Sequence, residues 1–339
     1  MDIQASQPQS GSQEPKIERS ITLRFVGDWG QANFHRICST LAQEFCDRAG
    51  SRSRVCIWNI RHGGFECLTE VEDGEVDLAI ATPVDLIAQA VQNHPTNTPA
   101  ARLYPRPLAN LRALAVLPQN DSMVLAIHPK FGISSFEELR QKKPALRIAT
   151  SRNDGTSFIG HVATEYMEAH GISEATLQSW GGSYKLDYRP EQSLFAAQAG
   201  EVDAVLQEAI MTPWWRDVIE KNGFVPLAVE KEALEVLQRT VGLGSNFLPA
   251  GYWSSLKEDL PTLSFQDFVV LVRNDMPEDV AHLLTWCLVE QRLTFERPYH
   301  HMPPHRSPLS YPLDPLKMAA SPIPLHQGAK RFYAAAKYL

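Results

Sequence analysis

The tetrapeptide Gly-Glu-Val-Asp occurs twice in the chain, at Gly74–Asp77 and at Gly200–Asp203. Each copy follows a helix-like stretch and precedes a short apolar run, which predicts a buried strand after a helix that ends at a left-handed glycine. The two glycines, at positions 74 and 200, are 126 positions apart. That spacing is too long for a solenoid repeat and suits two α/β domains built alike. Because so common a turn also recurs by chance, the flanking segments must show whether the chain contains two similar domains.

The flanking segments alternate between strand-like and helix-like patterns around both copies. Around the first copy we expect strands at 21–26, 54–60 and 76–81 and helices at 33–48, 64–72 and 84–92. Around the second copy we expect strands at 146–150, 175–180 and 202–207 and helices at 156–170 and 190–199. Strands that alternate with helices predict a parallel sheet, so each half is expected to form a Rossmann-like α/β domain.

Two further pairs of strand-like segments predict where the chain passes between the halves. Residues 111–117 and 123–127 are apolar and are joined by the polar connector Pro118–Asp121, and residues 261–264 lead in the same way into 268–273. If the chain crosses at both places, residues 20–118 and 265–339 form one discontinuous domain and residues 122–260 form the other. The two hinge strands then border a ligand cleft.

Composition narrows the class of protein. The chain of 339 residues is 44% hydrophobic and 21% charged, so it can bury two ordinary cores without disulfides or metals. A formal charge of -7 without a basic run argues against nucleic-acid binding. No apolar stretch reaches the roughly 18 residues that span a bilayer, so the chain is not expected to be membrane-inserted.

The N-terminal segment and the cysteines bear on location. Residues 1–20 are rich in Gln, Ser and Pro and contain no apolar core of a signal peptide, so they are expected to be a disordered tail. The five cysteines are odd in number and have no Cys-x-x-Cys spacing, which suits reduced thiols. Both features predict a cytoplasmic protein, or a periplasmic one if the true start differs.

Five short motifs follow one another in an order that resembles a known family. They are Gly63-Gly64 ahead of the first Gly-Glu-Val-Asp turn, 111–115, 153–157 opening a helix that ends at Gly171-Ile172, 277–280, and 324–333. In this order they resemble type II periplasmic binding proteins, and within that fold the TAXI-class solute receptors of TRAP transporters. The resemblance implies a small-molecule ligand and a TRAP-type membrane subunit as partner. It departs from the family at the loop Gly27–Phe34, so the ligand class is not implied.

Ligands of open α/β sheets bind beyond the carboxyl ends of the strands, and that rule selects the loops. The candidate ligand-binding residues of the first domain are Asp28, Trp29, Asn33, Arg61, Gly63, Gly64 and Thr82. Those of the second domain are Arg152, Thr156, Ser157, Glu208, Trp214 and Trp215.

A turn at Asp154–Ser157 precedes a predicted helix and could hold an anion. Free backbone N–H groups, the helix dipole and two hydroxyl groups would favour a carboxylate there. An ordinary helix N-cap explains the same residues. Gly63-Gly64 could form a similar site on the opposite wall, or simply a tight turn.

Adjacent indoles and loop charges suggest further contacts to a ligand. Trp214 and Trp215 begin a predicted helix, so at least one points away from the core and could stack on a ligand; the alternative places one in the core and one over the hinge. The acids Asp28 and Glu208 with the arginines Arg61 and Arg152 could clamp a zwitterion. Such loop charges are also often simply solvated.

Catalytic motifs of the common hydrolase, protease and nucleotide-binding classes are absent from the sequence. His300, His301 and His305 have ligand-like spacing but no cysteine or acidic companion, so neither a metal nor a cofactor is expected. His326 is expected to cap or pack the last helix. We therefore expect a solute-binding protein for a small organic acid or amino-acid-like ligand. The alternatives are a cytoplasmic enzyme, such as an aromatic-acid decarboxylase using His62, Glu208 and Arg152, and a ligand-sensing module.

Overall fold

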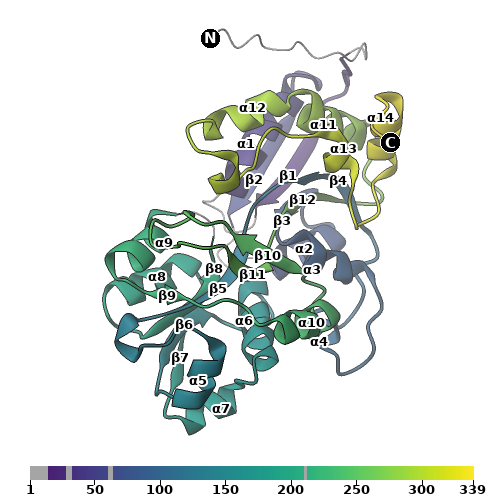
Figure 1. The fold of residues 1–339 in the computed structure, drawn as a ribbon. Helices are drawn as coiled ribbons and strands as arrows, with labels where there is room; N and C mark the ends of the chain where they lie inside the picture. Colours follow the sequence, from purple (N-terminus) through teal and green to yellow (C-terminus); the bar gives the residue numbers. More distant parts are fainter. Residues whose placement is uncertain (1–13, 28–32, 60–63, 210–211) are drawn as a thin grey trace.

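The computed structural model describes residues 14–27, 33–59, 64–209 and 212–339. The chain forms two lobes, one above the other in Figure 1, and each lobe is built on one β-sheet. Helices cover both sheets, which confirms the expected α/β class.

The first lobe has a five-stranded sheet in the order β2-β1-β3-β12-β4. Its strands are β1 (Thr22–Gly27), β2 (Arg54–Asn59), β3 (Leu78–Ala81), β4 (Leu111–Leu117) and β12 (Phe268–Arg273). Its helices and helical turns are α1 (Asn33–Cys46), α2 (Phe65–Glu72), α3 (Val84–Ala88), η1 (Gln89–Val91), α4 (Pro99–Leu103), α11 (Glu278–Glu290), α12 (Arg292–Glu296), η4 (Arg297–Tyr299), η5 (Pro304–Arg306), α13 (Pro315–Ala319) and α14 (Gln327–Ala335).

The second lobe has a seven-stranded sheet in the order β10-β11-β5-β8-β6-β7, with β9 also paired to β5. Its strands are β5 (Ser122–Ile127), β6 (Arg147–Ser151), β7 (Ser183–Asp187), β8 (Ala204–Glu208), β9 (Val225–Pro226), β10 (Ser245–Leu248) and β11 (Leu260–Ser264). Its helices and helical turns are η2 (Pro129–Phe131), α5 (Phe136–Lys142), α6 (Phe158–Ala169), α7 (Glu174–Ser179), α8 (Pro190–Gln198), α9 (Pro213–Arg216), the π-helical turn η3 (Asp217–Lys221) and α10 (Lys231–Thr240).

Both sheets are mixed rather than wholly parallel. The repeated core is parallel, with β1 between β2 and β3 in one lobe and β6 between β7 and β8 in the other. Beside it runs an antiparallel strand, β12 next to β3 and β5 next to β8. These two strands enter their sheets directly from the other lobe, at the end where the parallel strands finish. The expectation of parallel pairing is therefore confirmed for the strands around the two turns, and the crossing strands add antiparallel neighbours to each sheet.

The two Gly-Glu-Val-Asp turns make the same contacts. Their glycines have φ of 76° and 72°, the left-handed conformation that ends a helix. The backbone N–H of Asp77 donates to Arg24 O at 2.8 Å, and that of Asp203 donates to Arg147 O at 2.8 Å. Each aspartate Oδ2 then accepts from the backbone N–H of the same arginine, at 2.7 Å and 3.1 Å. The repeat is a structural device that ties a helix end to the central strand of each parallel unit, β1 or β6.

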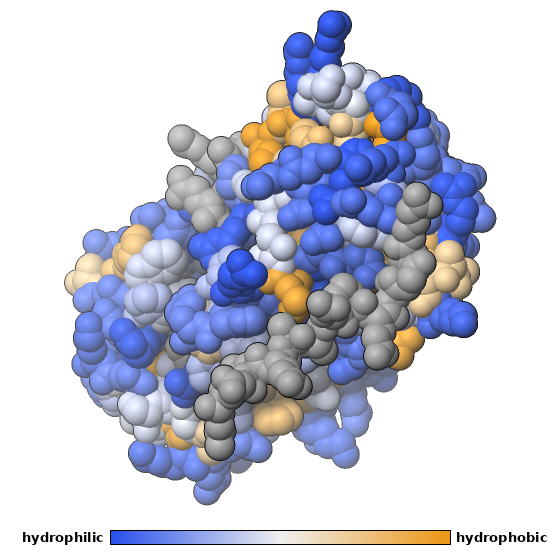
Figure 2. Space-filling view, turned by 90° about the horizontal axis from the view of Figure 1, so that it is seen from above, coloured by the Kyte–Doolittle hydropathy of each residue, from blue (hydrophilic) through white to orange (hydrophobic). Residues whose placement is uncertain are grey.

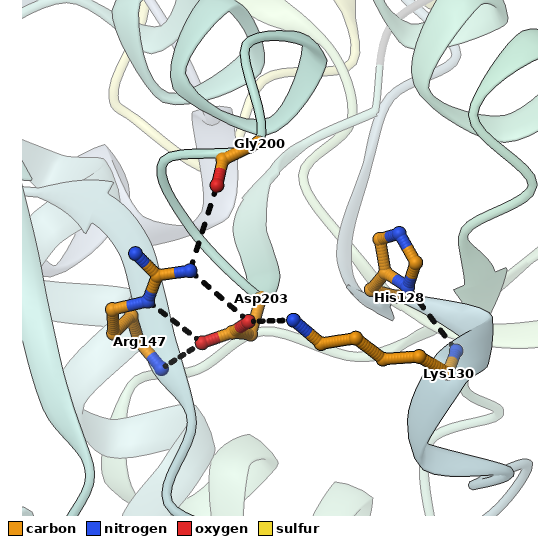
Figure 3. Close-up of polar contacts among 5 residues, drawn as sticks. All are labelled: His128, Lys130, Arg147, Gly200 and Asp203. Carbon is orange, nitrogen blue, oxygen red and sulfur yellow. Dashed lines mark hydrogen bonds and ion pairs between the residues drawn. The ribbon is translucent and has the colours of Figure 1, made fainter.

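The second copy carries an additional cation. Lys130 Nζ lies 2.6 Å from Asp203 Oδ1, while Arg147 Nε donates to Oδ2 at 2.9 Å (Figure 3). Burial of Asp203 opposes its ionisation, but the hydrogen bonds from Arg147 and Lys130 outweigh that effect and lower its pKa well below the ordinary value. The buried Asp203 carboxylate therefore lies between two cations, and these ion pairs stabilise the second lobe.

One expected strand is a helix. Residues 175–179 fall in α7, which Trp180 caps, and the strand that pairs with β6 is β7, further along the chain. The hydroxyl of Ser173 accepts from Thr176 N at 3.1 Å and caps the helix, and Gly181 follows it with φ of 82°. The cap and the terminating glycine outweighed the weak apolar pattern from which the strand was predicted.

Part of the expected disordered tail is docked. Residues 1–13 lie outside the described residues, but Ile17 is buried and pairs with Ala49, and its N–H donates to Arg48 O at 2.9 Å. Arg19 forms an ion pair with Asp279. The prediction of disorder is therefore wrong for residues 14–20, where one isoleucine among polar residues supplies the anchor.

The chain changes sheet between β4 and β5 and again between β11 and β12. The two connectors are hydrogen-bonded to each other: Gln119 N donates to Asp267 Oδ1 at 2.9 Å, Asp267 N donates to Gln119 O at 3.1 Å, and Phe265 N donates to Asp121 O at 3.0 Å. The exchange of sheets falls where the sequence places the hinge strands. The division into one discontinuous domain of residues 20–118 and 265–339 and a second of residues 122–260 stays a prediction.

The apolar interior is continuous between the lobes. One cluster runs from the first sheet through Tyr104 and Phe158 into one face of the second sheet, and a smaller cluster fills the other face beneath α8 and α9. The expected pair of separate cores was thus too simple, because aromatic side chains bridge the lobes. Seen from above, the surface is mainly hydrophilic with apolar residues in separate patches (Figure 2). Among the described residues no helix has the length and apolar character needed to cross a bilayer.

Candidate functional site

A pocket of about 440 Å³ lies where the carboxyl ends of strands from both lobes meet. The first lobe contributes the start of α1, the first connector contributes Gln119, and the second lobe contributes the segments after β7 and β8. Its lining residues are Asn33, Phe34, Gln119, Arg189, Pro190, Glu191, Gln192, Leu194, Phe195, Glu208, Thr212, Trp214, Trp215 and Pro308. The volume falls in the range that holds small organic ligands.

The second lobe gives the pocket an aromatic wall. The Thr212 hydroxyl accepts from Trp215 N at 3.2 Å and so begins α9, which fixes the direction of both indoles. Trp215 is buried, and its indole N–H donates to Glu208 O at 2.6 Å. Trp214 and Phe195 are 40% and 39% exposed and meet edge to face at 5.6 Å. The exposed pair can pack against an apolar or cationic ligand.

Two carboxyl groups lie together beside this wall. Asp121 is fully buried, accepts from Ser122 N at 2.7 Å, and is hydrogen-bonded to the Glu208 side chain. Burial and the neighbouring Glu208 charge raise the pKa of Asp121 well above its ordinary value. Burial raises the pKa of Glu208 to about 7, an effect that Glu191 reinforces and the hydrogen bond from Asp121 opposes. Asp121 therefore holds the proton and Glu208 is the carboxylate that titrates near neutrality.

Gln119 connects the carboxyl pair to the hinge. Its Nε2 donates to Asp121 Oδ2 at 3.3 Å, and its backbone is bonded to Asp267 of the second connector. The side chain is only 3% exposed, and its Oε1 has no hydrogen-bond partner among the residues that the structure describes. A buried acceptor without a partner costs free energy, so it is well suited to a donor on a ligand.

The single arginine in the described lining is already paired. Arg189 Nε lies 2.6 Å from Glu191 Oε1, and both residues belong to the segment that opens α8. This ion pair neutralises the positive charge within the wall. With Glu208 added, the described lining side chains carry a negative balance above neutral pH.

Asn33 lines the pocket from the first lobe, but its amide is held by the C-terminal part of the chain. Its Nδ2 donates to Pro308 O at 2.9 Å, and the hydroxyl of Tyr299 donates to its Oδ1. The segment 299–308 thus fixes the start of α1 at the pocket mouth. The Asn33 side chain therefore helps to position the pocket wall, and its amide has little hydrogen-bonding capacity left for a ligand.

The expected anion site at the start of α6 has a different structure. The Ser157 hydroxyl is buried and accepts from Gly160 N at 3.3 Å as a helix N-cap, and the Thr156 hydroxyl donates to Asp154 Oδ1 at 2.6 Å. The opposite glycine, Gly64, has φ of 94° and lies directly against Phe158. Phe65 N donates to Thr156 O at 3.4 Å. The two helix starts therefore contact each other between the lobes, and neither lines the pocket.

The remaining sequence candidates lie apart from the pocket or outside the described residues. Arg152 stacks on the ring of Tyr188 at 4.9 Å. Thr82 is buried, and its hydroxyl donates to Asp267 O at 2.8 Å, so it supports the second connector. Five candidates lie outside the described residues: Asp28, Trp29, Arg61, His62 and Gly63. Of the described members of the proposed zwitterion clamp and decarboxylase site, Glu208 lines the pocket and Arg152 does not.

Sequence reasoning missed several residues of the site. Asp121 and Gln119 were interpreted as a polar spacer, although two buried strands flank them and a buried acid is rarely accidental. Arg189, Glu191 and Phe195 follow a strand that was placed too early, so their position at a strand end was hidden. The expected capping role of His326 is confirmed, since its Nδ1 accepts from Gly328 N at 3.0 Å. Within the described ranges, no three His, Cys, Asp or Glu side chains gather in a manner suited to a metal ion.

The paired α/β lobes, the two hydrogen-bonded connectors and the cleft at the strand ends define the two-domain fold of the periplasmic binding proteins. Residues 40–335 match the NMT1-like family, and the chain belongs to that family. No curated protein gives a significant sequence match.

The chain is similar to solved structures at low sequence identity, of which PhnD1 supports the shared fold. PhnD1 of Prochlorococcus marinus (MIT 9301), solved in complex with methylphosphonate, is 10% identical with a TM-score of 0.51, over 94% of this chain and 99% of that one. A periplasmic transporter is 12% identical with a TM-score of 0.49, over 94% and 95% of the two chains. The alkanesulfonate-binding protein SsuA of Xanthomonas axonopodis pv. citri, bound to MOPS, is 17% identical with a TM-score of 0.38, over 95% of each chain. At 10% identity the likeness to PhnD1 concerns the fold alone.

Proposed function

We propose that this chain is a solute-binding protein that closes its two lobes on one small organic molecule. The observation that carries the proposal is the pocket of about 440 Å³ whose walls come from both lobes and from the connector between them. A ligand that touches both walls stabilises the closed arrangement by the difference between its affinities for the closed and open forms.

The connectors provide the hinge that such closure needs. Two short segments, 118–121 and 265–267, carry the chain between the sheets and are bonded side by side. Asp267 has φ of 59°, an unusual conformation for a residue other than glycine. Rotation about a few residues of paired connectors is the usual form of domain closure in two-lobed binding proteins.

The finer assignment within the fold rests on motif order. PhnD1, which shares the fold, was solved with a small anion in place, and this supports a small solute in general rather than an anion in this chain. The order of the five short motifs favours a TAXI-type receptor. In that form of the proposal, a TRAP-type membrane subunit is the partner that receives the solute.

The proposal is tested by a thermal-shift screen against amines, carboxylates, amino acids and neutral aromatic compounds, followed by tryptophan fluorescence. A true ligand at a hundredfold excess over its Kd adds about 2.7 kcal/mol to stability. Because Trp214 lines the pocket, binding should change its emission, and Trp214→Phe should remove most of that change. Trp58→Phe is the matched control, since Trp58 is equally exposed, at 39%, and does not line the pocket. Equal signals from the two variants would place binding elsewhere.

A further inference from the structure

Two polar groups of the described lining, Gln119 and Glu208, offer acceptors to a ligand. Gln119 Oε1 is buried and has no partner among the described residues, and the Glu208 carboxylate receives its one described hydrogen bond from Asp121. The Thr212 hydroxyl is already engaged at the start of α9, and the Asn33 amide is held by the C-terminal segment. A ligand that satisfies these two acceptors must therefore bring hydrogen-bond donors.

The charges around these acceptors also favour a ligand that carries hydrogen-bond donors, in particular a cation. Arg189 is the single cation of the described lining, and its Nε is 2.6 Å from Glu191. A carboxylate ligand would share the guanidinium with Glu191, which already neutralises its charge, and would meet the Glu208 charge as well. A cation meets neither obstacle, and the exposed face of Trp214 adds a favourable site for it.

We propose that the pocket selects an organic ammonium ion with an apolar body, whose N–H groups donate to Glu208 and Gln119 while the body packs against Trp214 and Phe195. This inference rests on the proposed solute-binding function and names its ligand class. It replaces the small organic acid that the sequence led us to expect.

The assignment has a consequence for pH. The charged groups beside Glu208 in the described structure are Asp121 on the first connector and Glu191 on α8, which is itself paired with Arg189. With a pKa of about 7, Glu208 is mostly protonated at pH 6 and mostly ionised at pH 8. An alkylammonium ion keeps its charge throughout this range, since its pKa is about 10. Affinity for the cation should therefore rise about tenfold from pH 6 to pH 8.

The test uses three probes of one shape: 2-phenylethylamine, phenylacetate and 2-phenylethanol. Isothermal titration of the full chain should give tightest binding for the amine, with an affinity that rises about tenfold between pH 6 and pH 8. At pH 7 the amine should release about half a proton, seen as a dependence of the measured heat on the buffer. The proton release is measured on the unaltered chain, so this test remains valid even if a substitution impairs folding.

Glu208→Gln should lower the affinity for 2-phenylethylamine by about ten- to hundredfold and abolish its pH dependence. Glu235→Gln, on the exposed face of α10, is the control and should change neither. Tighter binding of phenylacetate, or amine binding without proton release, would overturn the ammonium assignment while leaving the solute-binding function intact. If no compound of any class binds, the solute-binding function itself falls.

Discussion

Asp203→Asn should destabilise the chain more than the matched change Asp77→Asn, although both residues end the same tetrapeptide. The Asp203 side chain is 6% exposed and accepts from Arg147 N at 3.1 Å, Nε at 2.9 Å and Nη2 at 3.2 Å, and from Lys130 Nζ at 2.6 Å. The Asp77 side chain is 30% exposed and accepts from Arg24 N at 2.7 Å and, weakly, from Nε at 3.5 Å.

The magnitude follows from the hydrogen bonds that each substitution weakens. A hydrogen bond to a charged group contributes about 1.5 to 3 kcal/mol, but the cations around Asp203 are half exposed and can be rehydrated. We therefore expect Asp203→Asn to lower the free energy of unfolding by about 2 kcal/mol, and Asp77→Asn by about 1 kcal/mol or less. Urea denaturation at pH 7, with the slope of the transition compared between variants, measures both.

The pH dependence of stability tests the same ion pairs a second time. Hydrogen bonds from Arg147 and Lys130 place the folded pKa of Asp203 below its ordinary value of 3.8. The stabilisation is therefore complete above the unfolded pKa and is lost as the pH falls toward the folded pKa. The gap between the wild-type chain and Asp203→Asn should be constant from pH 7 to pH 5 and should narrow below pH 4. Equal losses for the two variants, or a gap that does not narrow in acid, would refute the reasoning.

Two further changes test other parts of the structure. Ser157→Ala removes the N-cap of α6 and should cost about 1 kcal/mol of stability while leaving ligand affinity within about twofold, as urea denaturation and titration of the variant would show; a large loss of affinity at unchanged stability would restore the anion site. Deleting residues 1–20 should lower the melting temperature by several degrees because Ile17 is buried, whereas deleting residues 1–13 should not; calorimetry that finds both deletions alike would show that the docked segment contributes nothing.

The architecture was predictable because it depends on patterns that recur along the chain. The two tetrapeptide copies, each between a helix and an apolar run, marked the two lobes, and the polar connector Pro118–Asp121 between apolar strands marked a crossing. Direction within the sheets was not predictable in the same way. Whether β5 and β12 run parallel or antiparallel depends on where the crossing chain enters each sheet, and no local pattern encodes that position.

The site was harder to predict because it depends on which side chains converge in space. Glu208 and Trp214 were expected at strand ends, and both line the pocket. For Ser157 the sequence left both an anion site and an N-cap open, because the two use the same residue types, and the hydrogen bond from Gly160 N shows the cap. Asp121 was not recognised from the sequence as a site residue. Its role depends on its contact with Glu208, which lies 87 positions further along the chain (from position 121 to position 208).

A crystal structure of the chain with the compound that gives the largest thermal shift tests the central claim most directly. The account predicts ligand density between the lobes, with a donor group at Glu208 and Gln119 Oε1 and an apolar group against Trp214 and Phe195. Density at the contact between Gly64 and Thr156, or outside the cleft, with the pocket between the lobes left empty, would contradict it.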